Sequence, residues 1–247
     1  MAPVTTVALP ETGPVWPAVP QTVRRAGRRW EQVVKIAVIG ASGWLGGTIA
    51  REAVSRGHEV TAIGRDAARL SQVEGARAVV ADLDDPEPIV DAVRGSDVVV
   101  SSVTDRSTAD RSRIPATARQ LLDLAPRAGV YRVAFVGGGG SLEIEPGLRA
   151  VDAPGFPEQH KAEALAQAEA LDVLRGSEGG VDWTYMSPPP HHLVPGEKTS
   201  GYQVRGGDRP VVNAAGESRI TAGDFAAAFV DELEANRFSR QRFTAGS

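Results

Sequence analysis

Three glycines at intervals of three residues, Gly40, Gly43 and Gly46, have the type and spacing to bind a phosphate. A turn of this kind needs a residue without a β-carbon where the backbone bends, where it approaches a pyrophosphate and where a helix packs on the preceding strand. The next helix would direct its N–H groups and the positive end of its dipole at the phosphates. An ordinary strand-turn-helix unit can carry the same pattern. The predicted cofactor-binding residues of this turn are Gly40, Ser42, Gly43, Trp44, Leu45 and Gly46.

Arg65 follows the second predicted strand, at the place that distinguishes the two nicotinamide dinucleotides. An acidic side chain there accepts hydrogen bonds from the free 2′-hydroxyl of NADH, whereas an arginine accommodates the 2′-phosphate of NADPH. Because Arg65 comes before Asp66 in the sequence GRD, we expect NADPH, with NADH as the alternative cofactor. In the other interpretation Arg65 is an exposed charge, and Asp66 is the N-cap of a helix that begins at Ala67.

The elements that must position these residues alternate along the chain. Short apolar runs predict strands over 33–39, 58–63, 76–81, 97–103, 131–136 and 181–186. Helices are expected over 44–56, 86–93, 111–128, 156–175 and 222–235. This alternation predicts a single α/β domain with a Rossmann-type, doubly wound parallel sheet. A hairpin over 201–213 around Gly206 and Gly207 and an edge strand over 242–244 complete the prediction.

Further candidates follow the carboxyl ends of the predicted strands, where ligands bind in such sheets. Asp82 and Leu83 could contact the adenine, and the aspartates Asp82, Asp84 and Asp85 could also start the next helix. The run from Gly137 to Gly140 forms either a plain flexible loop or a loop whose backbone a ring-shaped ligand approaches. Pro188 and Pro189 are expected to shape a nicotinamide pocket. The predicted cofactor-binding residues at these strand ends are Asp82, Leu83, Ser101, Ser102, Val103, Gly137, Pro188 and Pro189.

Composition and charge exclude several classes of protein. The 247 residues, 42% of them hydrophobic, suffice for one large α/β domain. Without cysteine the chain has no disulfide, thiolate metal site or cysteine nucleophile, and no pattern of histidines and carboxylates suggests a metal site. The net charge of −4 argues against a nucleic-acid partner, and no apolar run approaches the roughly 20 residues of a membrane helix. A small-molecule substrate is the expected partner, and a homo-oligomer is left open.

Residues 1–32 are rich in proline and show neither helical nor strand periodicity. We expect a flexible extension ahead of a dinucleotide-binding domain over 33–247, in which about 187–221 form a small substrate-binding region. The extension lacks the charged start and apolar stretch of a signal peptide. Its two arginine pairs are not followed by the apolar segment of a twin-arginine export signal. The cytoplasm is therefore the expected location.

These motifs together resemble the atypical short-chain dehydrogenase/reductases over about residues 34–247. The resemblance is carried by KIAVIGASGWLG, FVGGGGSLE, FPEQHKAEAL, DWTYMSPP and the closing ESRITAGDFAAAFVDELE. Within that family the chain looks most like the NAD(P)H-flavin reductases and biliverdin-IX-beta reductase, which also has a proline pair followed by histidine, as in Pro189-Pro190-His191. The resemblance implies NAD(P)H binding and hydride transfer, although regulators that only sense the dinucleotide share the glycine turn.

The proton donor of ordinary members of this family is missing. They use a tyrosine with a lysine four residues later, and none of Tyr131, Tyr185 and Tyr202 has a lysine at that offset. Lys161 lies in the corresponding helix, next to His160, where a tyrosine would be expected. A histidine, with an ordinary pKa of about 6.5, can act as the acid, but each could equally be a loop residue bonded to backbone or water. The candidate catalytic residues are His191, His192, His160, Lys161 and, as a hydrogen-bond donor, Ser141.

The sequence favours an NADPH-dependent reductase that transfers hydride to a flat, conjugated small molecule such as a flavin or a quinone. Such an acceptor spreads the incoming charge and needs no strong acid. One alternative is a regulator of the NmrA type that binds NADP(H) without turnover. The other is a specialised biosynthetic enzyme, either an imine or enone reductase or a catalyst that uses the cofactor without net redox change.

Overall fold

The computed structural model describes residues 33–104, 111–190 and 193–247. The strands of its main sheet are β1 (Lys35–Ile39), β2 (Glu59–Gly64), β3 (Arg77–Val80), β4 (Val98–Ser101), β5 (Arg132–Val136), β8 (Asp182–Ser187), β10 (Gln203–Gly206) and β12 (Gln241–Gly246). The helices are α1 (Trp44–Ser55), α2 (Ala67–Leu70), α3 (Pro86–Val93), α4 (Arg113–Arg127), α5 (Glu158–Arg175) and α6 (Ala222–Ala235). The five helices predicted from the sequence agree with the structure to within two residues at each end.

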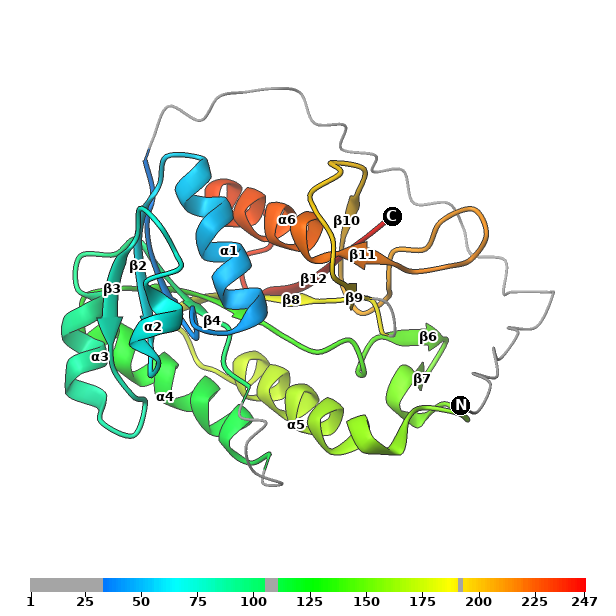
Figure 1. The fold of residues 1–247 in the computed structure, drawn as a ribbon. Coiled ribbons are helices and arrows are strands. Elements are labelled where there is room, and N and C mark those ends of the chain that lie inside the picture. The colour runs from blue at the N-terminus through cyan, green and yellow to red at the C-terminus, as the bar shows by residue number, and fades with distance from the viewer. Residues whose placement is uncertain (1–32, 105–110, 191–192) are drawn as a thin grey trace.

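The main sheet has the strand order β10-β12-β8-β5-β4-β1-β2-β3, with helices on both faces (Figure 1). Every neighbouring pair is parallel except β10 and β12, which are antiparallel. The strand order reverses beside β1, because the chain passes from β3 at one edge back to β4 in the centre. The predicted single-domain α/β fold with a Rossmann-type, doubly wound sheet is confirmed.

Two apolar cores lie on opposite faces of this sheet. Helices α1 and α6 cover one face, and α3, α4 and α5 cover the other (Figure 1). Successive side chains of a strand alternate between the two cores, so Tyr185 packs under α4 and α5 whereas Met186 packs under α1 and α6. All four residues of β4 are buried, as its unbroken apolar run predicts for a strand covered on both faces.

The two predictions for the C-terminal end of the sheet were wrong. β10 is not half of a local hairpin: it pairs with β12, with Gln203 opposite Gly246. β12 is not an edge strand, because it lies between β8 and β10. The reason is burial, since Phe243 and Ala245 of β12 are completely buried while β10 alternates between exposed and half-buried residues. β10 is thus the strand suited to the edge.

Two small sheets were not predicted. They pair β6 (Glu143–Glu145) with β7 (Leu148–Arg149) and β9 (Leu193–Val194) with β11 (Ile220–Thr221), and a 3-10 turn, η1 (Ala150–Asp152), follows β7. β6 and β7 lie in the connection after β5, β9 lies in the connection after β8, and β11 lies in the connection after β10. These strands have only two or three residues, too few for a periodic signal in the sequence.

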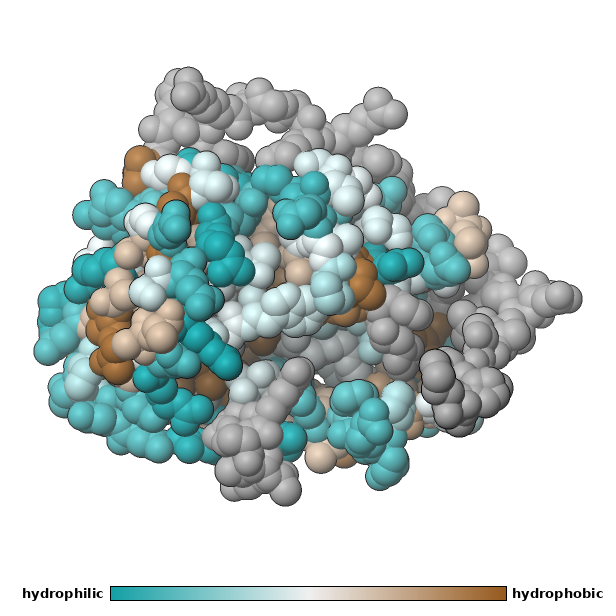
Figure 2. Space-filling model, viewed as in Figure 1, coloured by the Kyte–Doolittle hydropathy of each residue, from teal (hydrophilic) through white to brown (hydrophobic). Residues whose placement is uncertain are grey.

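The surface is mainly hydrophilic, with small separate hydrophobic spots on the face in view (Figure 2). The most exposed large apolar side chains are Tyr131 at 61%, Val80 at 59% and Val33 at 53%. Val80 belongs to the edge strand β3. In the described parts of the chain, no helix is long and apolar enough to cross a membrane.

Candidate cofactor and substrate site

A cavity of about 790 Å³ lies at the carboxyl end of the sheet, between the loops that follow β1, β2, β3, β4, β5 and β8. Doubly wound sheets bind their ligands at this place. The cavity brings together most of the residues predicted to bind the cofactor, namely Gly40, Ser42, Gly43, Trp44, Leu45, Arg65, Asp82, Leu83, Ser102, Val103, Gly137, Pro188 and Pro189. Ser101 and Gly46 do not line it. Ser101 is the buried last residue of β4, and Gly46 packs inside the turn.

The glycine turn closes tightly around Gly40. This residue has a φ of +88°, which favours glycine, and its N–H donates to the carbonyl oxygen of Ile63 at 2.9 Å. A β-carbon on Gly40 would lie 2.4 Å from the carbonyl oxygen of Ser102. A β-carbon on Gly46 would lie 2.3 Å from the carbonyl oxygen of Gly40. Both glycines are therefore required for α1 to begin this close to β1 and β4.

The start of α1 suits an anion. Its N-cap is Gly43, which has no side chain to accept a hydrogen bond, and its first turn contains no acidic residue. Within the described ranges no group accepts from the N–H groups of Trp44, Leu45 or Gly46. Such free N–H groups and the positive end of the helix dipole bind phosphate oxygens. The turn therefore fits the pyrophosphate of a dinucleotide cofactor.

Arg65 and Asp82 face each other on the cavity wall formed by the ends of β2 and β3. Nη1 of Arg65 lies 3.8 Å from Oδ2 of Asp82, and the side chains are 62% and 41% exposed. Asp66 has a different role, because its side chain accepts from the N–H of Arg69 at 3.1 Å and caps α2. Asp66 is thus the N-cap that the sequence offered as an alternative, while Arg65 is a cationic group of the cavity.

The run from Gly137 to Gly140 packs against protein at every residue. β-Carbons at its four positions would lie 2.0 Å from the ring of Tyr185, 2.8 Å from Cβ of Gln167, 2.5 Å from the carbonyl oxygen of Pro188 and 2.6 Å from Cβ of Ala164. All four glycines also line the cavity, so the approach of a ring-shaped ligand to this loop stays a prediction. They are needed because the loop passes between α5 and the segment after β8 with no space for side chains.

Helix α5 contributes one stripe of its surface to the cavity: His160, Glu163, Ala164 and Gln167. Their spacing of three, four and seven residues places them on one face of the helix. Lys161 is not among the cavity-lining residues; it is 45% exposed and lies 3.9 Å from Glu158. One residue corresponds to about 100° around a helix of 3.6 residues per turn, so the structure separates His160 from Lys161. Glu163 and Gln167 were not predicted from the sequence, although their helical spacing from His160 could have indicated them.

Ser141 also lies apart from the cavity-lining residues, because Arg242 binds it. Nη1 of Arg242 donates to Oγ of Ser141 at 2.7 Å, and Nη2 donates to its carbonyl oxygen at 3.1 Å. Nε of Arg242 donates to Asp208 at 2.8 Å, and Arg175 lies 2.5 Å from the same carboxylate. Partial burial acts to raise the pKa of Asp208, but Arg242 and Arg175 outweigh it and hold this pKa below its ordinary value.

His191 and His192 lie outside the described residues. Their neighbours Pro190 and Leu193 line the cavity. The catalytic roles of these histidines, and of His160, therefore stay predictions. In the described parts of the chain, no group of three or more histidine and acidic side chains could hold a metal ion.

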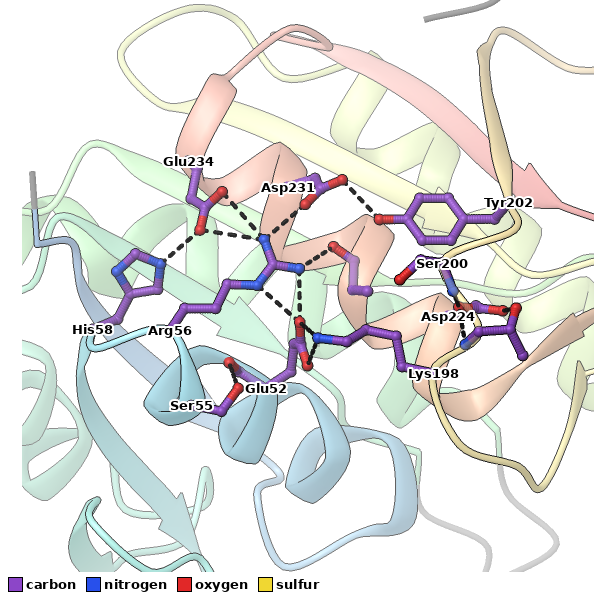
Figure 3. A network of polar contacts seen from close by, with 12 residues as sticks. Glu52, Ser55, Arg56, His58, Lys198, Ser200, Tyr202, Asp224, Asp231 and Glu234 are labelled. Carbon is purple, nitrogen blue, oxygen red and sulfur yellow. Dashed lines mark hydrogen bonds and ion pairs between the residues drawn. The ribbon is translucent and has the colours of Figure 1, made fainter. Parts of the chain in front are cut away.

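A polar network fastens the segment after β9 to α1 and α6 (Figure 3). Nζ of Lys198 donates to Glu52 of α1 at 2.8 Å. The buried carboxylate of Asp224, in the first turn of α6, accepts from the N–H groups of Thr199 and Ser200, both at 2.8 Å. These contacts hold part of the predicted substrate-binding region, 187–221, against the helix whose start faces the cavity.

Arg56 joins α1 to α6 at the centre of the same network (Figure 3). Its guanidinium lies 2.7 Å from Glu52, 2.7 Å from Asp231 and 3.2 Å from Glu234. Burial acts to lower the pKa of Arg56, but bonds to Asp231 and Glu52 outweigh it and raise this pKa above its ordinary value. The charge that anchors the two helices is therefore permanent.

The fold and the site define a dinucleotide-binding protein of the Rossmann type. More narrowly, the chain belongs to the NAD(P)H-binding family, whose model matches residues 40–236. The uncharacterized protein YwnB of Bacillus subtilis (strain 168) is 35% identical over 216 residues, which are 87% of this chain and 99% of that protein. The resemblance to atypical short-chain dehydrogenase/reductases inferred from the motifs is confirmed.

Two of the similar solved structures illustrate this likeness, and each covers 87% of this chain. One, from Burkholderia pseudomallei and described as a candidate exported protein, is 42% identical, is covered completely and has a TM-score of 0.78. The other, from Streptococcus pneumoniae TIGR4 and described as a candidate NADH-flavin reductase, is 34% identical, is covered over 99% of its length and has a TM-score of 0.71.

Proposed function

We propose that this protein is an NADPH-dependent reductase that acts on a flat, conjugated small molecule such as a flavin or a quinone. The observation that carries the proposal is the continuous cavity from Arg65, past the uncapped start of α1, to the stripe of α5. This arrangement offers a cationic group for a 2′-phosphate, free N–H groups for a pyrophosphate and a second wall for a substrate. A relative of 34% identity is described as a candidate NADH-flavin reductase.

A reduced nicotinamide, when bound, supplies a hydride at the substrate end of the cavity. The chain's own part is to orient the cofactor and the acceptor and to exclude water. Pro188 and Pro189 form a rigid wall, Val103 and Phe156 add apolar surface, and His160 is the described histidine that faces the cavity. We assign the proton donor to His191, His192 or His160, with solvent as the alternative source.

The test is to incubate the purified protein with NADPH and panels of flavins, quinones and imines and to follow NADPH oxidation. Turnover with flavins or quinones supports the proposal. Turnover confined to imines identifies the biosynthetic alternative. Tight NADPH binding without oxidation by any acceptor refutes the reductase and favours a regulator of the NmrA type. Substitution of the histidine that donates the proton lowers turnover and leaves NADPH affinity unchanged.

The remaining expectations rest on the sequence alone: a small molecule as partner, no nucleic acid or membrane, and a cytoplasmic location. They stay predictions, as does the oligomeric state. Cell fractionation tests the cytoplasmic location directly. The experiment is needed because the relative from Burkholderia pseudomallei is described as a candidate exported protein.

A further inference from the structure

Tyr185 and Gln167 form a buried polar pair beside the α5 end of the cavity. Tyr185 is 1% exposed and Gln167 is 6% exposed. The hydroxyl of Tyr185 lies 2.9 Å from the carbonyl oxygen of Gln167 and 3.1 Å from its side-chain Oε1, toward both of which it donates. It also accepts from the N–H of Gly138 at 3.1 Å. The proton of this hydroxyl and one of its acceptor sites are therefore used within the protein.

The same pair leaves one amide group of Gln167 without a protein partner. Its Oε1 faces Tyr185, so the Nε2 group lies on the other side of the carboxamide. Among the residues that the structure describes, none accepts a hydrogen bond from Nε2, and Gln167 lines the cavity. Nε2 is not among the side-chain atoms buried without a partner, so it is reached from the cavity, where an oxygen of a ligand can take the place of water as its acceptor.

We propose that the Nε2 group of Gln167 donates to an oxygen of the substrate, and that the substrate is a conjugated carbonyl compound, of which a quinone is the simplest case. This inference rests on the proposed function and narrows it. A quinone takes up a hydride from NADPH and one proton, forms a hydroquinone and leaves NADP⁺. Its oxygen carries negative charge before the proton arrives. An amide donor fixed in advance beside that oxygen stabilises the charge.

Two features of the site keep Gln167 in one orientation. A β-carbon on Gly138 would lie only 2.8 Å from Cβ of Gln167, so the stem of this side chain is packed against the glycine loop. The hydroxyl of Tyr185 holds the side-chain oxygen, and burial raises the pKa of this hydroxyl to about 12, so that it keeps its proton near neutral pH. Tyr185 is therefore a positioning residue, which acts through Gln167.

The test uses the full chain and two readouts, affinity and turnover, with menadione as the quinone. Gln167→Leu removes the donor and preserves the size of the side chain, while the backbone carbonyl still accepts from Tyr185. We expect about 10- to 100-fold slower quinone reduction, at and below the lower end of the roughly 100- to 1000-fold loss known for one oxyanion donor. Menadione should bind at least threefold more weakly to the NADP⁺-loaded variant, and the Kd for NADPH should change by less than about twofold.

Tyr185→Phe keeps the ring that packs on Gly137 and removes the hydroxyl that orients the amide. We expect a smaller loss of turnover, about three- to tenfold, and no further loss when it is combined with Gln167→Leu, because both changes act on one group. Independent, multiplying losses would contradict the positioning role of Tyr185.

The outcomes separate this inference from the proposed function. If the wild type reduces quinones and Gln167→Leu does so equally fast, the inference is wrong and the reductase stands. If the wild type binds menadione through Gln167 and no acceptor of the panel oxidises NADPH, the recognition of carbonyl compounds stands and the reductase is wrong. If the wild type neither binds nor reduces menadione, the inference is overturned, while turnover with flavins still supports the reductase.

Discussion

Replacing Arg65 by alanine should weaken NADPH much more than NADH. The guanidinium lines the cavity at the end of β2, and a charge-assisted hydrogen bond to a 2′-phosphate contributes roughly 1.5–3 kcal/mol. Two factors reduce this value. The side chain is 62% exposed, and it gives up its contact with Asp82 at 3.8 Å, an exposed pair of about 0.2–1 kcal/mol.

The net loss for NADPH is then about 1–2 kcal/mol, or about 5- to 30-fold in Kd. NADH has no phosphate for Arg65 to contact, so its Kd should change by less than about twofold. The converse change, Asp82→Asn, removes a carboxylate that competes with the phosphate for Arg65 and should strengthen NADPH a few-fold. Both effects should shrink as salt is added, because these charges are exposed.

The assay is a calorimetric titration of each cofactor into the wild type and the variants at two salt concentrations. Arg69→Ala is the matched control, since Arg69 is also exposed and also paired with an aspartate but is absent from the cavity wall. Equal losses for NADPH and NADH in Arg65→Ala would refute the reasoning, and so would a selective loss of NADPH in Arg69→Ala.

Two further predictions concern stability. Gly137→Ala places a methyl group 2.0 Å from the ring of Tyr185, and in a urea titration it should lower the free energy of unfolding by about 1–3 kcal/mol. Gly201→Ala is the control, because its β-carbon would be 3.4 Å from its nearest neighbour, and it should have little effect in the same titration. Asp208→Asn removes a carboxylate whose pKa is held below its ordinary value by Arg242 and Arg175. It leaves the buried guanidinium of Arg242 without its charge partner, and because the Asp208 side chain is 41% exposed and solvent screens the pair, the variant should be less stable by about 1–2 kcal/mol at pH 7. A depressed pKa gives stability that is present above the unfolded value and lost as the pH falls through the folded value, so the gap should close in acid. A gap of constant size in urea titrations from pH 7 down to strong acid would contradict this linkage.

The central fold was predictable because its signals are local. An apolar run such as that of β4 predicts a strand buried on both faces, and α6 begins after Thr221, whose side chain accepts from the N–H of Asp224 at 3.1 Å as an N-cap should. β10 and β12 were misplaced because strand pairing is decided by contacts between segments about 40 residues apart. No local pattern in either strand predicts which other strand it pairs with.

The same distinction applies to the site. The glycine turn and Arg65 were found from sequence, since a tight turn and a charge at a strand end are properties of a few consecutive residues. Ser141 was assigned to the cavity because it follows a glycine run at a strand end. Its actual partner, Arg242, is 101 residues away, and a buried arginine that requires partners decides where that serine lies.

The two ends of the cavity, at the glycine turn and at the stripe of α5, are positioned by different kinds of group. The proposed cofactor half consists of backbone groups, and the glycine pattern is therefore sufficient to locate it. The proposed substrate half consists of side chains of one helix face, so it depends on the rotation of α5, which is set where Ala164 packs on Gly140 and Gln167 packs on Gly138. The four glycines after β5 thus do more than form a loop: by letting α5 approach the sheet, they turn His160 and Gln167 toward the cavity and leave Lys161 outside it. Any enlargement of these glycines should disturb substrate recognition before cofactor binding.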